Sequence, residues 1–304
     1  MTVDLSIEDE AIGNRGERLG ADSLDRFAIE HLHRYVLAAG LVNGQHVLDI
    51  ASGEGYGSNL LAQSASQVVG VDIDPKAVRH ASTKYRRANL EFRQGSATAI
   101  PLEDASVDFC VSFETLEHHD KHEEMLKELR RVLKPGGVLM MSTPDKVNYT
   151  DRPQIVNEFH VKELYTQEFV DLLRRQFSTV ELYFQEADFL GLVMPRSGSD
   201  SHLQYFSEPS FQGARHGASI EHPIYNIALA TDLTGALPAL GTSVMSGTSA
   251  LEFMQKTHSI ETARLQRRID ALTTTQEEMR ASLSFKIGRV LTFPLRLLSG
   301  RGMA

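Results

Sequence analysis

Tryptophan is absent from the 304 residues, and cysteine occurs once, at Cys110. A single cysteine excludes an internal disulfide and a cysteine-based metal framework. No run of about 18 apolar residues occurs, so no membrane-spanning helix is predicted. The segment Met1–Glu10 holds acids instead of the basic and then apolar pattern of a secretory signal. We therefore expect a cytoplasmic protein.

Basic residues are fewer than acidic ones: Lys and Arg total 31, and Asp and Glu total 40. The formal net charge is −9 at neutral pH. Broad affinity for nucleic acid needs a basic surface, so nucleic acid is not expected as a partner. Hydrophobic residues make up 41% of the chain, which allows a sizeable core. The length predicts one large domain or two small ones.

The chain is organised around residues 47–57, which read Val-Leu-Asp-Ile-Ala-Ser-Gly-Glu-Gly-Tyr-Gly. A buried strand carrying Asp49, a glycine turn and the start of a helix form a corner where backbone can approach a ligand closely. A dinucleotide fingerprint requires glycine or alanine at position 58, where this chain has Ser58. An acid just before the glycines suits a cationic or amine-bearing ligand better than a pyrophosphate. A tight turn without a ligand is the alternative.

Predicted strands and helices alternate along the chain. Strands are predicted at 46–50, 67–72, 90–92, 107–113, 138–141, 179–184 and 224–230. Helices are predicted at 23–40, after the Asp74-Pro75 start signal, and at 120–133 and 162–175. This alternation predicts an α/β fold with a doubly wound, Rossmann-like sheet of seven strands.

The predicted domain order has four parts. A flexible N-terminus, 1–22, precedes a domain at 23–232, in which 187–222 is a loop insertion. A linker, 233–254, leads to a helical tail, 255–304. The tail has a short coiled-coil seam with apolar residues at Leu265, Ile269, Leu272, Met279 and Leu283. Its basic amphipathic end could bind the inner face of a membrane peripherally; a packed helix or an oligomer contact is the alternative.

Three motifs occur in a characteristic order. They are Asp49-x-Ala-x-Gly-x-Gly55-x-Gly, then Val71-Asp-Ile-Asp74, then Leu133-Lys-Pro-Gly-Gly137. This order resembles the class I S-adenosylmethionine-dependent methyltransferases, whose sheet has seven strands with the last one antiparallel. The resemblance implies S-adenosylmethionine as the cofactor.

The resemblance also implies the cofactor-binding residues. Asp49 would hold the methionine amino group directly or through water, Asp72 would take the ribose hydroxyls, and Ile73 would pack on the adenine. Arg34 would meet the methionine carboxylate, or else lie on a surface helix. Ser96 stands where many members have an aspartate for the adenine amino group. The remaining residues implied at this site are Ala51, Gly53, Gly55, Ala97 and Phe113.

An acid–histidine group follows the predicted fourth strand. Glu114, Glu117 and His118 fall at i, i+3 and i+4 and would share one face if helical. The spacing resembles ubiquinone-pathway O-methyltransferases and small-RNA 3′-end 2′-O-methyltransferases, which bind a divalent ion there. The resemblance implies a Mg²⁺, Mn²⁺ or Zn²⁺ site, with His160 as a further ligand. Without a metal, His118, His119 or His160 is the candidate general base; a helix cap without chemistry is the plain alternative.

The segment Asn157–Tyr165 points to the acceptor. It resembles a segment of bacterial methyltransferases of surface-glycan assembly, with Glu158 in place of a proline. The resemblance implies a sugar hydroxyl of a surface glycan or glycolipid precursor. Two alternatives stay open: O-methylation of a phenolic or quinone-type small molecule, and an inactive cofactor-binding scaffold subunit.

Overall fold

The computed structural model describes residues 26–187, 205–210, 213–217, 220, 222–233, 237–245, 265–269 and 271–275. The chain divides into two compact units, Met1–Gly247 and Thr248–Ala304. The predicted flexible N-terminus, much of the predicted linker and the basic end of the tail lie outside the described residues.

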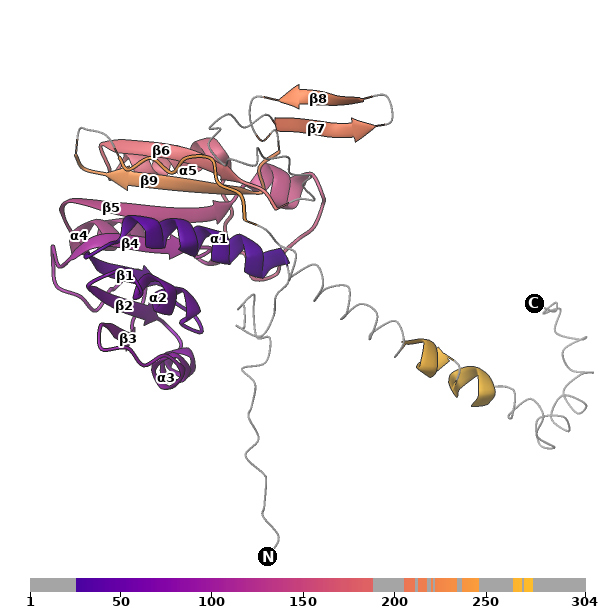
Figure 1. Ribbon diagram of the computed structural model, residues 1–304, viewed down its shortest axis with the longest axis horizontal. Helices are drawn as coiled ribbons and strands as arrows, with labels where there is room; N and C mark the ends of the chain where they lie inside the picture. Colours follow the sequence, from indigo (N-terminus) through magenta and orange to yellow (C-terminus); the bar gives the residue numbers. More distant parts are fainter. Residues whose placement is uncertain are drawn as a thin grey trace, which may run out of the picture. The chain divides into compact units, whose positions relative to one another are not determined.

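The first unit contains a seven-stranded sheet in the order β3-β2-β1-β4-β5-β9-β6 (Figure 1). The strands are β1 (His46–Ile50), β2 (Gln67–Asp72), β3 (Leu90–Gln94), β4 (Val107–Phe113), β5 (Leu133–Pro144), β6 (Thr179–Gln185) and β9 (Tyr225–Thr231). Strand β9 is antiparallel to both neighbours, and the other pairs are parallel. The predicted Rossmann-like sheet with an antiparallel last strand is confirmed.

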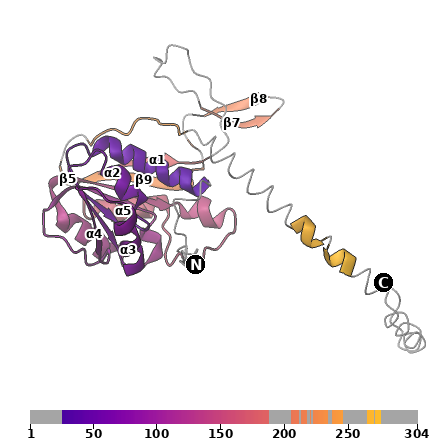
Figure 2. The ribbon, with the colours of Figure 1, turned by 60° about the horizontal axis from the view of Figure 1, so that its bottom comes forward.

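Helices cover both faces of the sheet (Figure 2). Alternate residues of β1 point to opposite faces, because side chains alternate along a strand. Leu48 belongs to the core cluster with α4 (His122–Val132) and α5 (Thr166–Arg174). Val47 belongs to the cluster with α1 (Arg26–Leu41) and α2 (Tyr56–Leu61). Strands buried on both faces read as near-continuous apolar runs, as the sequence does at 107–113.

The helix α3 (Pro75–Lys84) follows β2 and begins where its sequence predicts. The Asp74 side chain accepts a hydrogen bond from the Lys76 backbone N–H at 2.8 Å, and Pro75 occupies the first helical position. Both features favour a helix start, since proline needs no hydrogen-bond acceptor there.

Two predicted boundaries are wrong by several residues. Strand β5 begins at Leu133 instead of 138, because Leu133 pairs with Val107 before an irregularity, after which the ladder resumes at Val138. Helix α5 begins at Thr166 instead of 162. The backbone N–H groups of Val161 and Lys162 donate to the Glu117 carbonyl, which ties this stretch to another element.

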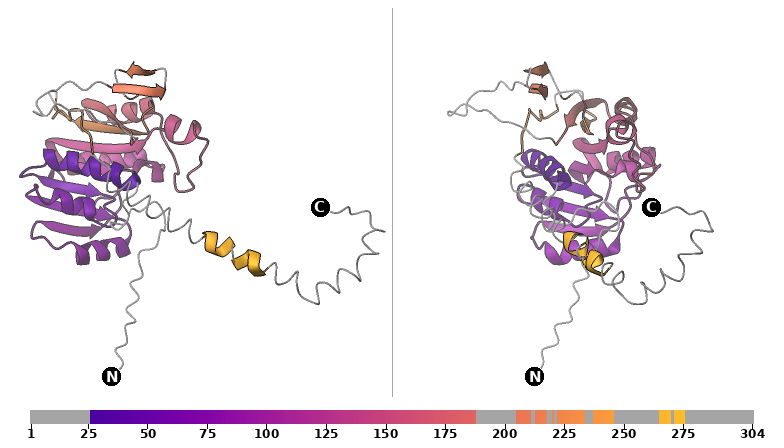
Figure 3. Two further views of the ribbon diagram at one scale, coloured as in Figure 1. Left: turned by 45° about the vertical axis from the view of Figure 1, so that its right-hand side comes forward. Right: turned by 90° about the vertical axis from the view of Figure 1, so that its right-hand side faces the viewer.

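The predicted insertion at 187–222 is more than a loop. It contains the hairpin of β7 (Tyr205–Ser210) and β8 (Gly213–Gly217), a separate two-stranded sheet (Figure 3). Strands joined by a two-residue connection can pair locally even where the composition is rich in turn formers.

Within the second unit, residues 265–269 and 271–275 are helical. The side chains of Leu265, Ile269 and Leu272 are 55%, 55% and 63% exposed. The coiled-coil seam proposed for them therefore stays a prediction. Among the described residues, no helix is both long and apolar enough to cross a bilayer.

Candidate active site

A cavity of about 900 Å³ lies at the carboxyl ends of β1, β2 and β4. The strand order reverses between β1 and β4, which is where open α/β sheets bind ligands. The cavity is lined by most of the residues implied for the cofactor: Ala51, Gly53, Asp72, Ile73, Ser96, Ala97 and Phe113. It is also lined by His118, His119 and His160.

The cofactor end of the cavity centres on Asp72. Its Oδ2 accepts a hydrogen bond from the Gly53 backbone N–H at 2.8 Å, and its Oδ1 accepts one from the Asp74 N–H at 2.9 Å. Gly53 has φ +55°, and a Cβ there would meet no atom within 4 Å. The turn thus leaves open space beside a fixed carboxylate. The Ile73 side chain is 67% exposed on the same wall, an apolar surface that an adenine ring could cover. These residues fit S-adenosylmethionine.

Asp49 lies beneath this end and does not line the cavity. Its side chain is fully buried, and its two oxygens accept from the Tyr35 hydroxyl at 3.1 Å and the Ser58 hydroxyl at 2.6 Å. Desolvation raises the pKa of Asp49 to about 7, against the two hydrogen bonds, which lower it. In this geometry Asp49 positions Tyr35, which does line the cavity.

Gly55 is required for packing and does not line the cavity. Its φ is +89°, and a Cβ would lie 2.7 Å from side-chain atoms of Ala81 and Phe92. The spacing of the glycines therefore serves two needs, ligand space at Gly53 and contact between α2, α3 and β3 at Gly55.

Arg34 is not among the residues that line the cavity. It is fully buried, its Nη1 donates to Gln185 Oε1 at 2.6 Å, and its Nη2 lies 3.7 Å from Glu114 Oε1. Its guanidinium carbon lies 4.8 Å from the centre of the Tyr225 ring. Arg34 thus supports the wall that Glu114 and Tyr225 form, and its contact with a methionine carboxylate stays a prediction.

The shared helical face expected for Glu114, Glu117 and His118 is wrong. Glu114 has φ +49°, and only Leu116–His118 form a single 3-10 turn. A left-handed non-glycine residue is strained, and such residues cluster at functional sites. The turned backbone directs the Glu114 carboxylate to the Ser142 hydroxyl, which donates to its Oε1 at 2.6 Å. Burial raises the pKa of Glu114.

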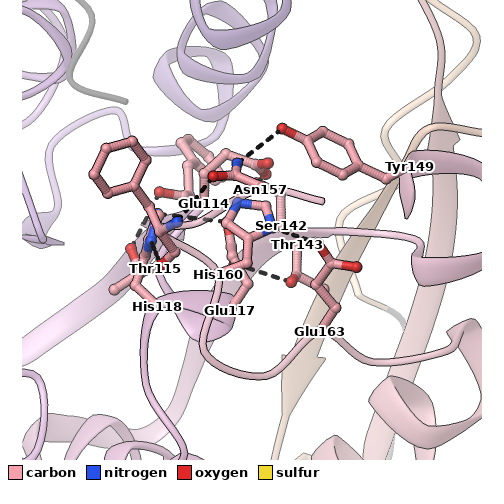
Figure 4. A network of polar contacts seen from close by, with 12 residues as sticks. Glu114, Thr115, Glu117, His118, Ser142, Thr143, Tyr149, Asn157, His160 and Glu163 are labelled. Atoms are coloured by element: carbon pink, nitrogen blue, oxygen red, sulfur yellow. Dashed lines mark hydrogen bonds and ion pairs between the residues drawn. The ribbon is translucent and has the colours of Figure 1, made fainter. Parts of the chain in front are cut away.

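The structure brings Glu117, His118 and His160 together (Figure 4). One potential ligand atom from each lies within 4.8 Å of the others, and Glu114 is not part of this group. Glu117 is buried: its Oε2 accepts from the Thr143 hydroxyl at 3.0 Å, while its Oε1 has no hydrogen-bond partner. Burial and the neighbouring Glu114 raise the pKa of Glu117 well above its usual range.

Both imidazoles of this group are oriented through Nδ1. His118 Nδ1 lies 3.1 Å from the Phe159 carbonyl oxygen, and His160 Nδ1 lies 2.5 Å from Glu163 Oε1. An oxygen acceptor at Nδ1 places the proton of the neutral imidazole there, so Nε2 carries the lone pair. That form is the one required both for metal binding and for accepting a proton.

Sequence reasoning missed two functional neighbours of His160. The Glu163 side chain is 7% exposed and also accepts from the Thr150 hydroxyl at 2.8 Å. The Tyr149 ring stacks on His160 with centroids 5.2 Å apart (Figure 4). The His160-x-x-Glu163 spacing could have indicated the first contact, whereas Tyr149 gave no signal.

His119 lines the cavity but is held differently. Its Nδ1 accepts from the Lys121 backbone N–H at 3.1 Å, and its Nε2 lies 3.2 Å from Met125 Sδ. Burial and the adjacent His122 lower the pKa of His119. Because its Nδ1 accepts, its neutral form carries the proton on Nε2, which makes it a weaker candidate base than His160.

Residues 48–141 match a family model described as Methyltransferase domain. A probable S-adenosylmethionine-dependent methyltransferase of Mycolicibacterium smegmatis is 39% identical over 139 residues, 45% of this chain and 53% of that protein. One of Mycobacterium tuberculosis is 41% identical over 128 residues, 42% of this chain and 46% of that protein. The chain spans about half the length of these curated relatives.

One more curated relative and one solved structure are similar to this chain. Erythromycin 3''-O-methyltransferase of Saccharopolyspora erythraea is 35% identical over 126 residues, 40% of this chain and 41% of that protein. A solved structure from Thermotoga maritima, described as a S-adenosylmethionine-dependent methyltransferase and possible histamine N-methyltransferase, aligns with a TM-score of 0.48 and 21% identity over 68% of this chain and 92% of that chain. Residues 48–141 are thus similar to methyltransferase domains, and the curated relatives that match this region are described as S-adenosylmethionine-dependent.

Proposed function

We propose that this protein transfers a methyl group from S-adenosylmethionine to a hydroxyl oxygen. The observation that carries the proposal is the shared cavity: Asp72 and Gly53 line the part that we call the cofactor end, and His118 and His160 line the part that we call the acceptor end. When bound, S-adenosylmethionine supplies an electrophilic methyl group on a sulfonium. The protein must then align the acceptor oxygen with that methyl and remove the acceptor proton.

The acceptor end offers a base for that proton. His160 Nε2 carries the lone pair because Glu163 holds Nδ1, and a carboxylate beside Nδ1 stabilises the imidazolium that forms. The acceptor oxygen would form its new bond to the methyl carbon as the carbon–sulfur bond breaks, with S-adenosylhomocysteine as the leaving group and the acceptor proton passing to His160. The buried wall around it restricts water, which strengthens each electrostatic contact.

A sugar hydroxyl of a surface glycan or glycolipid precursor is the proposed acceptor. The support is the resemblance of Asn157–Tyr165 to glycan-assembly methyltransferases, together with relatives named as O-methyltransferases. These relatives include erythromycin 3''-O-methyltransferase and a fatty-acid O-methyltransferase. A phenolic or quinone-type acceptor would use the same proton acceptor and is the alternative for the acceptor screen.

A divalent ion at Glu117, His118 and His160 is proposed as the alternative to His160 as the base, because an ion on His160 Nε2 would occupy the lone pair that accepts the proton. The buried Glu117 Oε1 supports it: this oxygen accepts no hydrogen bond, which is costly, and it lies 4.0 Å from His118 Nε2, so a cation bound by both would satisfy it. Two imidazoles and one carboxylate suit Zn²⁺ or Mn²⁺ better than Mg²⁺, which prefers oxygen. Such an ion would lower the pKa of an acceptor hydroxyl. Calorimetry with each ion, repeated on Glu117→Gln, tests this; equal heats for both proteins would refute the site.

The test of the transfer is release of S-adenosylhomocysteine with sugar, phenolic and blank acceptors. We expect turnover above the blank with the sugar panel and its loss in His160→Ala. Tight binding of S-adenosylhomocysteine without turnover on any acceptor would favour the scaffold reading instead. Absence of binding would refute the proposed cofactor.

The C-terminal unit is proposed as a peripheral membrane or oligomer contact. Its support is the basic amphipathic sequence after Met279. Flotation of the full chain with anionic vesicles, against a chain ending at residue 254, separates the two: vesicle binding by the full chain alone indicates the membrane.

A further inference from the structure

Large apolar side chains are exposed on one stretch beside the cavity. In the first unit's described residues, the segment 147–165 holds six of them: Val147, Ile155, Val156, Phe159, Val161 and Tyr165. Val156, Val161 and Ile155 are 86%, 64% and 60% exposed. Single exposed apolar residues are ordinary, but several in one short stretch mark a binding surface. We call Ile155, Val156, Phe159 and Val161 the apolar loop surface.

The backbone of this surface is anchored to its surroundings. The Phe159 N–H donates to Asn157 Oδ1 at 3.0 Å, and the Asn157 amide donates to the Tyr149 hydroxyl at 3.4 Å. The Val161 N–H donates to the Glu117 carbonyl at 2.8 Å. The same loop thus fixes both the outward apolar residues and His160, so a ligand on the surface is held in a constant relation to the base.

One residue of the apolar loop surface also lines the cavity. Phe159 lines the cavity and is also 44% exposed, and its carbonyl orients His118. A molecule whose hydroxyl reaches His160 would therefore have its remaining bulk beside Phe159. An apolar extension of that molecule would pass directly onto the apolar loop surface.

The charges favour a neutral chain over an anionic membrane. Between Arg152 and Lys162 the only charged residue is the acidic Glu158. Binding to anionic lipid depends on clustered basic residues, which this loop lacks. A neutral alkyl or prenyl chain needs only apolar area.

From this placement we infer that the apolar loop surface binds the hydrocarbon chain of an amphipathic acceptor whose hydroxyl enters the cavity. The inference rests on the proposed transfer and narrows its acceptor to molecules with a polar head and an acyl or prenyl tail. It assigns residues 155–161 the role of selecting acceptors by tail length.

The test uses methyl, butyl, hexyl and octyl β-glucosides as probes, below their micelle concentrations. Binding to the full chain saturated with S-adenosylhomocysteine is measured by NMR titration. We expect Kd to fall about fourfold for each added methylene that the surface buries, because apolar area is removed from water. The variant Ile155→Ser/Val156→Ser/Val161→Ser should remove this dependence while leaving S-adenosylhomocysteine affinity unchanged. The matched control Val36→Ser/Val244→Ser, which removes exposed apolar side chains outside the cavity lining, should keep it.

Three results would overturn the inference. Tail length could have no effect on the wild type, or the same effect on the triple variant. The triple variant could instead shift sedimentation from dimer to monomer, which would make a second copy of the chain the occupant. Calorimetry with S-adenosylhomocysteine separates these three results from a failure of the proposed function. If the wild type does not bind S-adenosylhomocysteine, the proposed cofactor is refuted, whereas the three results above refute only the binding of a tail to the apolar loop surface.

Discussion

The acidic residues at the two ends of the cavity differ in how many of their oxygens accept hydrogen bonds. Asp72 at the cofactor end and Asp49 beneath it both accept hydrogen bonds on each of their oxygens. At the acceptor end, one oxygen of Glu117 accepts no hydrogen bond and lies 4.0 Å from His118 Nε2, and Glu114 has its described contacts on a single oxygen, with Ser142 and Arg34. A carboxylate whose two oxygens both accept hydrogen bonds is held in one position, and we call it a fixed landmark for binding. An under-satisfied one is costly and is found where chemistry needs it.

The two ends also differ in the parts of the chain that supply their contacting residues. The cofactor end is made by strand ends and the turns that follow them, and Ser52 N–H donates to Val71 O on the neighbouring strand. The acceptor end joins the turn after β4 to the long connection after β5, as His118 meets His160. Binding is thus built on the rigid sheet, while the acid–histidine group depends on a loop that can vary between relatives.

The strongest test of this contrast is Asp72→Ala. The alanine removes the acceptor for the Gly53 and Asp74 N–H groups as well as the charge that would meet ribose hydroxyls. Each charged hydrogen bond is worth about 1.5–3 kcal/mol, so S-adenosylhomocysteine should bind about 100- to 1,000-fold more weakly by calorimetry. Glu54→Gln is the matched control, because Glu54 lines the same cavity but is paired with Lys84. Equal losses in both would mean that overall cavity charge, and not the Asp72 landmark, sets affinity.

A pH series on Asp49→Asn tests the buried landmark. The pKa of Asp49 is raised from 3.8 to about 7, so the folded state keeps a proton that the unfolded chain releases. This contribution to stability is complete below the unfolded pKa and is lost as the pH rises through the folded one. From about pH 5 to pH 8 the wild type should lose about 2–3 kcal/mol of unfolding free energy that Asp49→Asn does not lose.

Urea denaturation at several pH values measures that difference. Asp171→Asn, at an exposed acid on α5, should keep the wild-type slope. Parallel pH profiles for the wild type and Asp49→Asn would show that Asp49 is ionised in its burial site.

Glu163→Gln tests the acceptor end. Glutamine keeps the size but removes the charge that stabilises His160 as an imidazolium, and loss of such an orienting carboxylate costs about 10- to 100-fold. We expect kcat to fall about tenfold or more, with S-adenosylhomocysteine affinity within twofold of wild type. Glu158→Gln, an exposed acid of the same loop, serves as the control. A matching fall in cofactor affinity would show that Glu163 only holds the fold.

The smallest effect is expected at Ser96. Its hydroxyl accepts from the Thr98 N–H at 3.2 Å and lies 3.0 Å from Thr98 Oγ1, so it is engaged by its own turn. Ser96→Ala should weaken S-adenosylhomocysteine binding less than threefold in the same calorimetric assay. A loss approaching that of Asp72→Ala would place Ser96 among the fixed landmarks.

The cofactor end could be anticipated because its signals are local. A buried strand, a glycine turn and an acid at the next strand end are all legible in short stretches, and Asp72 and Gly53 meet through sheet register alone. Arg34 could not be placed in the same way. Its burial against Glu114 depends on how α1 packs over the sheet, which no local pattern encodes.

The arrangement of the acceptor end could not be predicted from sequence periodicity, for a related reason. The spacing of Glu114 and Glu117 fits a helix, but the left-handed Glu114 backbone is fixed by contacts with Ser142 and Arg34. Glu163 and Tyr149 reach His160 only because the chain between them folds back on itself. Tertiary contacts of this kind override local propensity.

The place of β9 bears on how the protein is made. This strand is the last of the sheet to be synthesised, yet it pairs with β5 on one side and β6 on the other. About 40 residues separate β6 from β9, which at 5–20 residues per second is roughly 2–8 s of translation. During that interval one edge of β5 and the whole of β6 lack this pairing partner on the ribosome. The nascent chain therefore carries an open sheet edge, the kind of surface that chaperones shield, until Thr231 has emerged.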